Sequence, residues 1–295
     1  MSASNTKAGI LLMIATTLVF SFQDVMSRHL AGAYNIWMVV MIRYWFFAMF
    51  VMALTLRRPN GLRLAAQTNM PWIQIARGLL LAGEILVMVK AFTLLGVIET
   101  HAVFAMSPLL VTAFSGPILG EKVGWRRWLA IGVGFIGVLI ILQPGSGVFN
   151  INALIPFTAA AMFALYSLLT RYVGREDSSE TSFFWAGMVG LVVTTAVGIW
   201  HWEPMSPVDW GWMLLLCVFA ALAHWMLIRC YEVAEASAVQ PFSYFQLVFV
   251  SILGVMLFGE TLRTNVVIGA VIVVSAGIFT LIRSRIVAMR AARGG

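Results

Sequence analysis

The sequence predicts an all-α integral membrane protein with ten transmembrane helices, arranged as two inverted repeats of five helices. Three observations predict this fold class. Apolar residues make up 61% of the 295 positions and charged residues 11%, and the mean hydropathy of +0.93 is far from that of a water-soluble globule. Ten apolar runs of helix length follow one another, and a Gly-Glu motif ends both the fourth and the ninth run. Ten spans of about 20 residues leave no room for a sizeable soluble domain.

Each apolar run is bounded by charged residues, Pro, Gly or Asn, and each is long enough to cross a bilayer as a helix. The runs do not alternate apolar and polar residues, as the strands of a membrane barrel do, so helices are predicted throughout. Only the brief polar break in LLGVIETHA separates the third run from the fourth. The predicted spans are residues 8–28, 34–56, 71–94, 98–119, 124–142, 151–172, 181–200, 209–231, 236–258 and 264–282.

Lys and Arg residues fall mainly on one side of these spans. Fourteen lie on the side of the two termini, two (Arg28 and Arg263) lie on the other side, and three lie within the runs. Because cytoplasmic loops carry an excess of basic residues, both termini are expected in the cytoplasm of a bacterial-type inner (plasma) membrane. The net charge of +7 then needs no nucleic-acid partner. The fourteen are Lys7, Arg57, Arg58, Arg63, Lys122, Arg126, Arg127, Arg171, Arg175, Arg229, Arg283, Arg285, Arg290 and Arg293.

The Gly-Glu motif indicates an internal repeat. It occurs in PILGEKVGWRR and again in MLFGETLRT, with many basic residues around the first copy and few around the second. Since five helices separate the copies, the second repeat must enter the membrane from the opposite side. The predicted repeats are residues 1–148 and 149–295. We expect Gly120 and Gly259 to end their helices in left-handed caps, which places Glu121 and Glu260 beside the N-terminus of the next helix in a structural role.

These motifs resemble the drug/metabolite transporter superfamily of the EamA type. LGE follows the fourth run and FGE the ninth, with Pro108 thirteen residues before Glu121. MIRYWFFA around Arg43 and VFSFQDVMSRHL are similar to the second and first helices of that family. The chain departs from the pattern in the second repeat, where Leu247 stands in place of the family proline and Pro241 comes earlier.

The resemblance implies two five-helix bundles around a central cavity that move small metabolites by alternating access. It also implies that the fifth and tenth helices are scaffold elements or form a homodimer contact. The small residues of GVGFIG (132–137) and of the last span favour close helix packing there. The overall pattern is similar to that of YddG-type exporters of aromatic amino acids.

Charged residues inside the spans are the first candidates for function. Arg43 lies near the middle of the second span and Glu84 near the middle of the third, where each lone charge costs at least ~2.5 kcal/mol. Equal depth predicts that they pair, and Arg77 lies on nearly the same helical face as Glu84. The pair is either a buried structural ion pair or a group that acts in gating or proton coupling.

A second group lies toward the side opposite the termini. Asp24, Lys90 and His101 form an external gate or a titrating cluster around the histidine. Alternatively, Asp24 and Lys90 extend to the lipid headgroups.

Polar and aromatic residues deeper in the spans are candidates for solute binding. A zwitterionic amino acid needs donors for its carboxylate, acceptors for its ammonium and an apolar or aromatic wall, and these residue types supply all three. For any one of them, simple helix packing is the favoured interpretation. The candidates are Gln23, Tyr166, His224, Trp225, Tyr244 and Gln246.

The sequence therefore predicts a secondary transporter that exports small amphipathic metabolites, with aromatic or hydrophobic amino acids as the preferred substrates. It contains no phosphate-binding loop, no paired metal-ligand spacing and no nucleophile elbow, so no cofactor is predicted. Efflux of lipophilic cations is the alternative within transport. A membrane enzyme acting on lipid-linked substrates would need a polar cluster at the interface, and GREDSSE (174–180) is interpreted instead as a solvated turn.

Overall fold

The computed structural model describes residues 6–57, 61–120, 123–142, 152, 154–234 and 239–293. Within these ranges the chain is helical and contains no strand. The first repeat comprises α1 (Thr6–Ala33), α2 (Ile36–Leu56), the short α3 (Gly61–Ala66), α4 (Pro71–Leu95), α5 (Val97–Phe104), α6 (Ser107–Leu119) and α7 (Trp125–Leu142). The second comprises α8 (Leu154–Val173), α9 (Ser179–Gly198), η2 (Ile199–His201), α10 (Pro207–Val233), η3 (Gln240–Tyr244), α12 (Phe245–Phe258) and α13 (Thr264–Arg293).

Eight helical segments of the described chain are long and apolar enough to cross a membrane, and α5 with α6 counts as one of them. The chain is therefore an all-α integral membrane protein, as predicted. The predicted ten spans also need α7 and the shorter apolar helix that contains α12, so the exact count stays a prediction. The predicted boundary between residues 148 and 149 lies outside the described residues.

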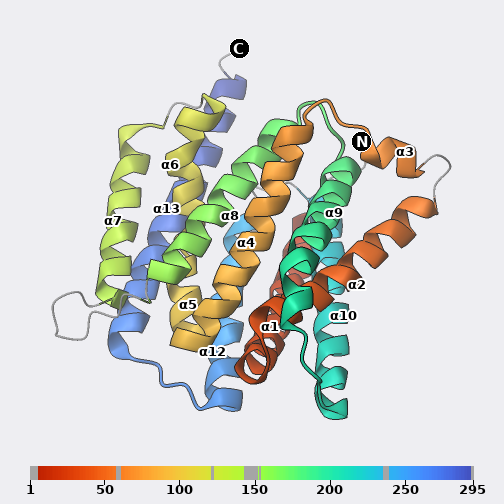
Figure 1. The fold of residues 1–295 in the computed structure, drawn as a ribbon. Helices are drawn as coiled ribbons and strands as arrows, with labels where there is room; N and C mark the ends of the chain where they lie inside the picture. Colours follow the sequence, from red (N-terminus) through yellow and green to blue (C-terminus); the bar gives the residue numbers. More distant parts are fainter. Residues whose placement is uncertain are drawn as a thin grey trace.

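The predicted glycine caps are confirmed. Gly120 ends α6 and Gly259 ends α12, both in the left-handed conformation, with φ of 73° and 62°. α6 ends at the upper end of the bundle in Figure 1, whereas α12 ends at the lower end, so the corresponding helices of the two repeats run in opposite directions. Glu121 lies outside the described residues.

The fourth span of the first repeat is interrupted, and the corresponding span of the second repeat begins with a 3-10 turn. A two-residue break at Ala105 and Met106 separates α5 from α6, and Pro108 stands in the first turn of α6. In the second repeat the 3-10 turn η3, which contains Pro241, precedes α12. Proline lacks the N–H that a continuous helix would use, and broken helices of this kind frame solute sites in many transporters.

Helices from opposite repeats form the core. α1 packs against α10 and α12, α2 packs against α9, and α4 packs against α8 and α9 (Figure 1). At one flank α7 packs along α13, where Gly137 faces Gly269 so closely that a Cβ on Gly137 would lie 2.9 Å from the carbonyl oxygen of Gly269. This is the close packing of small residues that the sequence predicts for the fifth and last spans.

Candidate functional site

A small cavity lies in the core where α2, α4 and α10 meet. Its volume of about 20 Å³ holds no more than a water molecule, so the central cavity implied by the family resemblance is nearly closed in this conformation. Two predicted site residues, Arg43 and His224, line it. The full lining is Arg43, Tyr44, Phe47, Leu81, Ile85, Cys217, Ala220 and His224.

Aromatic rings make one wall of this cavity. The imidazole of His224 lies 5.6 Å from the ring of Phe47 and 5.3 Å from the ring of Phe20, measured between centroids. Its Nδ1 is 2.8 Å from the carbonyl oxygen of Ala220. Since a carbonyl only accepts hydrogen bonds, Nδ1 carries a proton there, which leaves Nε2 free to accept a hydrogen bond from a solute.

Arg43 and Glu84 are both buried, at 9% and 7% exposure, but no ion pair within 4.0 Å joins them among the described contacts. The predicted direct pairing is therefore absent in this conformation. α2 and α4 contact each other, so the helices themselves do not keep the two side chains apart; Arg43 instead lines the small cavity, whose lining does not include Glu84. Arg43 and Asp24 are the charged groups that act on Glu84 electrostatically.

Arg77 also does not reach Glu84, because it binds partners nearer the upper end of α4. Its Nε donates to Thr170 Oγ1 at 2.9 Å, its guanidinium lies 5.2 Å from the ring of Tyr166, and it hydrogen-bonds Gln74. Gln74 in turn donates to Asp177 Oδ2 at 2.7 Å. We call these residues the upper polar network, and it joins α4 of the first repeat to α8 and the α8–α9 turn of the second.

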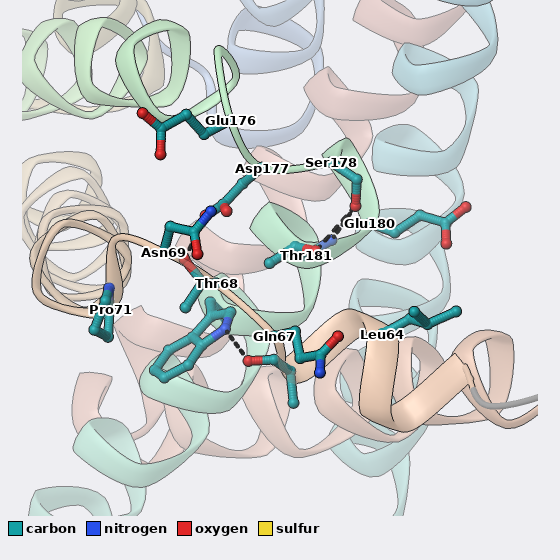
Figure 2. A pocket seen from close by; sticks show the side chains of 12 residues that line it. Leu64, Gln67, Thr68, Asn69, Pro71, Glu176, Asp177, Ser178, Glu180 and Thr181 are labelled. Atoms are coloured by element: carbon teal, nitrogen blue, oxygen red, sulfur yellow. Dashed lines mark hydrogen bonds between the residues drawn. The ribbon is translucent and has the colours of Figure 1, made fainter.

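The upper polar network lies below a surface depression of about 790 Å³. Figure 2 shows Thr68 and Asn69, which precede α4, facing Asp177 and Ser178 of the α8–α9 turn across this depression. Thr68 Oγ1 donates to Asp177 Oδ2 at 2.5 Å. GREDSSE is therefore not only a solvated turn, since Asp177 turns inward and ties the two repeats together.

Three other predicted residues surround the Asp24 carboxylate. Gln246 Nε2 of α12 donates to Oδ2 at 2.8 Å, and Gln23 Nε2 donates to Oδ1 at 3.2 Å. His101 Nε2 of α5 lies 3.0 Å from Oδ2, although it is not aligned for a hydrogen bond. In this Asp24 cluster Asp24 and His101 are in contact, whereas Lys90, which was predicted in the same group, is exposed elsewhere, and the cluster spans both repeats.

Glu260 makes a further link between the repeats at the lower end. Its carboxylate accepts the backbone N–H of Val97 at 2.9 Å and of Ile98 at 3.0 Å, and it pairs with Arg28 of α1. We expected Glu260 at the N-terminus of the next helix, α13, and that expectation is wrong. The carboxylate does lie at a helix N-terminus, as the helix dipole favours, but the helix is α5 of the other repeat.

Three predicted residues lie elsewhere. Lys90 is exposed on the outer surface, as the alternative of headgroup contact predicts, and Trp225 is 42% exposed with Arg229 over its ring. The Tyr244 hydroxyl is buried beside Gly277 without a described hydrogen-bond partner. The structure thus divides most of the predicted residues between the cavity, the upper polar network, the Asp24 cluster and the surface, while Glu84 and Tyr244 are buried outside these groups.

The model of the EamA-like transporter family matches residues 7–143 and again residues 150–282. The chain belongs to the EamA-like transporter family. The two matches follow one another along nearly the whole chain, in agreement with an internal repeat. The members of this family are transporters and not enzymes, and this EamA-like transporter is a membrane carrier of small molecules.

Named relatives of this EamA-like transporter carry different small molecules. It is 25% identical to an S-adenosylmethionine uptake transporter of Rickettsia prowazekii (strain Madrid E) over 92% of each chain. It is 35% identical to a riboflavin transporter of Vibrio cholerae over 59% of this chain and 58% of that one. A pseudopaline exporter of Pseudomonas aeruginosa is 23% identical over 92% of this chain and 94% of that one. A solved crystal structure matches with a TM-score of 0.63, at 17% identity, over 95% of this chain and 99% of that one, and supports the fold alone.

Sequence reasoning missed the two groups of contacts that close the ends of this EamA-like transporter. At the lower end it gave Arg28 no partner. At the upper end it did not single out Gln74, Thr170 or Asp177. One signal was available, because Gln74 and Arg77 are three residues apart in an apolar run and therefore share a helical face.

Proposed function

We propose that this EamA-like transporter carries small solutes that combine an amino-acid group with an apolar or aromatic part, and that it works by alternating access. The observation that carries the proposal is the lining of the central cavity, where the guanidinium of Arg43 faces a wall formed by Tyr44, Phe47 and His224. Such a lining can hold both the charged and the aromatic part of one solute.

Each part of the solute has a counterpart in the core. The Arg43 guanidinium offers two parallel donors to a carboxylate. The buried carboxylate of Glu84, on which Arg43 acts electrostatically, is the counterpart of the ammonium group. The named substrate of one relative, S-adenosylmethionine, contains an amino-acid group, and that of another, riboflavin, is aromatic.

The two closed ends support alternating access. The upper polar network and the contacts of Glu260 both join helices of opposite repeats, on either side of the cavity. In the proposed cycle one set of contacts breaks while the other holds, so the solute site opens to one compartment at a time. We also propose the inner membrane as the location, with both termini cytoplasmic, which reporter fusions at the two termini would test.

Efflux of lipophilic cations is the second candidate, and one observation favours it. Such a mechanism needs a deep carboxylate that is accessible to a cation, and Glu84 is bound neither to Arg43 nor to Arg77 in the described contacts. A delocalised cation between Glu84 and the aromatic wall would be stabilised by charge and by cation–π contact.

A flux assay in proteoliposomes separates the two candidates. The panel contains phenylalanine, leucine, S-adenosylmethionine, riboflavin and tetraphenylphosphonium, measured in both directions. The first proposal expects uptake of the amino acids and its loss in Arg43→Gln, with Lys90→Gln as a surface charge control. If tetraphenylphosphonium is the only compound transported, and if Glu84→Gln abolishes this flux while Arg43→Gln retains it, the second candidate function replaces the first. If the protein transports none of the amino acids, the amino-acid substrate hypothesis is wrong.

Thiol labelling tests where the solute binds. Cys217 lines the cavity, and Cys230 is the other cysteine of the chain. In a Cys230→Ser background, a small membrane-permeant maleimide should react with Cys217 only when the cavity opens. A transported amino acid should slow this reaction in proportion to its occupancy. Unchanged labelling at saturating substrate would place the solute outside this cavity.

A further inference from the structure

The Asp24 cluster is enclosed and lies where three helices meet. Asp24 belongs to α1, His101 to α5 and Gln246 to α12, so the cluster joins the first repeat to the second. The side chains of His101 and Asp24 are only 6% and 10% exposed. Both carboxylate oxygens already have partners, and Asp24 does not line the central cavity, so the cluster is separate from the proposed solute site.

We propose that the Asp24–His101 pair is the proton-binding site that couples transport to a pH gradient. This inference rests on the proposed transport function and adds the coupling ion. The imidazole takes up one proton at its unprotonated ring nitrogen, and no covalent bond is made or broken between heavy atoms. With Asp24 ionised, the pair changes from one net negative charge to none.

The Asp24–His101 pair lies next to the Glu260 contacts at the lower end, so protonation of the pair affects those contacts. Asp24 lies one helical turn before Arg28 on α1, and His101 lies one turn after Val97 and Ile98 on α5. Residues four apart in a helix share a face, so the pair and the Glu260 contacts occupy consecutive turns of the same two helices. A protonated His101 attracts the Asp24 carboxylate more strongly than the neutral ring does. Proton uptake therefore draws α1 toward α5 beside the Glu260 contacts, and proton release loosens them.

Two polar atoms without a described partner lie beside the pair on α1. Ser27 Oγ and Gln23 Oε1 are buried without a described hydrogen-bond partner. Ser27 lies between Asp24 and Arg28 in sequence, so its hydroxyl can accept a hydrogen bond from water when the lower end opens. This orphaned hydroxyl would relay a proton between the pair and the aqueous side.

The other charged groups near the pair are few. Glu84 of α4 acts on Asp24, and Arg43 of α2 acts on Glu84. From α10, His224 faces the central cavity, and from η3 the Tyr244 hydroxyl lies against Gly277. The remaining charged groups on the contacting helices have other partners or are exposed. Glu99 pairs with Arg263 at 3.1 Å, Arg28 pairs with Glu260, and Asp209 contacts His29. Arg77 belongs to the upper polar network, and Lys90 is exposed.

The test measures substrate flux in two modes on purified full-length protein in proteoliposomes. In counterflow, labelled substrate exchanges against unlabelled substrate without a pH gradient. In the driven mode, an imposed pH gradient acts on the same liposomes, and an internal pH-sensitive dye reports proton movement. We expect His101→Gln and Asp24→Asn to retain counterflow and to lose both gradient-driven accumulation and substrate-dependent proton flux. His29→Gln, at an exposed histidine near the same end, is the matched control and should keep both modes.

The outcomes separate this inference from the proposed function. If the wild type shows no counterflow of any panel substrate, the transport proposal fails. If the wild type shows counterflow that does not respond to the gradient, or if His101→Gln and Asp24→Asn keep gradient-driven accumulation, the proton site is overturned. Loss of gradient response in Glu84→Gln alone would also overturn it, because it would place the coupling site on α4. Counterflow in each variant shows that it has folded, and His101→Asn provides a second substitution if His101→Gln fails that check.

Discussion

Glu260 accepts the backbone N–H of Val97 at 2.9 Å, so a carboxylate from the second repeat caps a helix of the first. The same carboxylate accepts from Ile98 and pairs with Arg28, whose guanidinium lies 4.0 Å from the ring centroid of Phe258. One side chain thus satisfies two N–H groups that have no partner within α5 and neutralises a cation near the lower end.

Removing the charge of Glu260 should weaken the contacts that close the lower end. Glu260→Gln keeps the size of the side chain but loses the ion pair and the charge at the helix N-terminus, so we expect a loss of about 0.5–2 kcal/mol in stability. Thermal unfolding in detergent, followed by tryptophan fluorescence, measures the change. The control is Glu99→Gln, since its partner Arg263 is 65% exposed and such pairs contribute less than about 1 kcal/mol. Equal shifts for the two variants would contradict the proposed closure.

Gly96 is the second point at which this contact can be tested. Its φ of 85° and ψ of 171° belong to a region that only glycine adopts readily, and a Cβ there would lie 2.6 Å from Glu260 Oε1. Gly96→Ala should cost about 1–3 kcal/mol from backbone strain, in addition to displacing the carboxylate. Gly32→Ala is the matched control, because a Cβ at Gly32 meets no atom within 4 Å. A Gly96→Ala protein as stable as the Gly32→Ala protein would show that the conformation is not required.

The contact between α7 and α13 gives a packing prediction. A Cβ on Gly269 would lie 2.5 Å from the carbonyl oxygen of Gly137, so Gly269→Val must push the two helices apart, at a cost of about 1–3 kcal/mol. Gly132→Val adds the same atoms at a position with open space and should be close to neutral. The unfolding temperatures of the two variants in detergent provide the comparison, and indistinguishable values would argue against close backbone contact.

A double-mutant cycle tests the relationship between Arg43 and Glu84. Because no described ion pair joins them, the stability effects of Arg43→Gln and Glu84→Gln should add to within about 0.5 kcal/mol. The cycle of Arg77→Gln with Thr170→Val is the positive control, since those side chains are 2.9 Å apart and contacting residues couple by about 0.5–3 kcal/mol. A coupling between Arg43 and Glu84 as large as that of the control would indicate a conformation in which they pair.

The membrane fold follows from the sequence because run length, composition and glycine caps are local properties. Gly120 and Gly259 were predicted as left-handed caps on that basis and adopt that conformation. The partners of the charged residues depend on which helices meet across the two repeats, and no local pattern specifies that. Arg43 and Glu84 have equal depth on helices that contact each other, but Arg43 lines the small cavity and Glu84 does not. Asp24 and His101 were grouped by depth in the same way, and here the two side chains do meet.

The Gly137–Gly269 contact constrains how the molecule can move. Two backbones that touch have no flexible side chain between them to take up a sliding or tilting motion. The rearrangement that admits a solute must therefore be absorbed by helices joined through longer side chains, such as α1, α4 and α9. Helices α7 and α13 then stay fixed relative to each other while the other helices move. Their outer surface keeps one shape throughout the cycle.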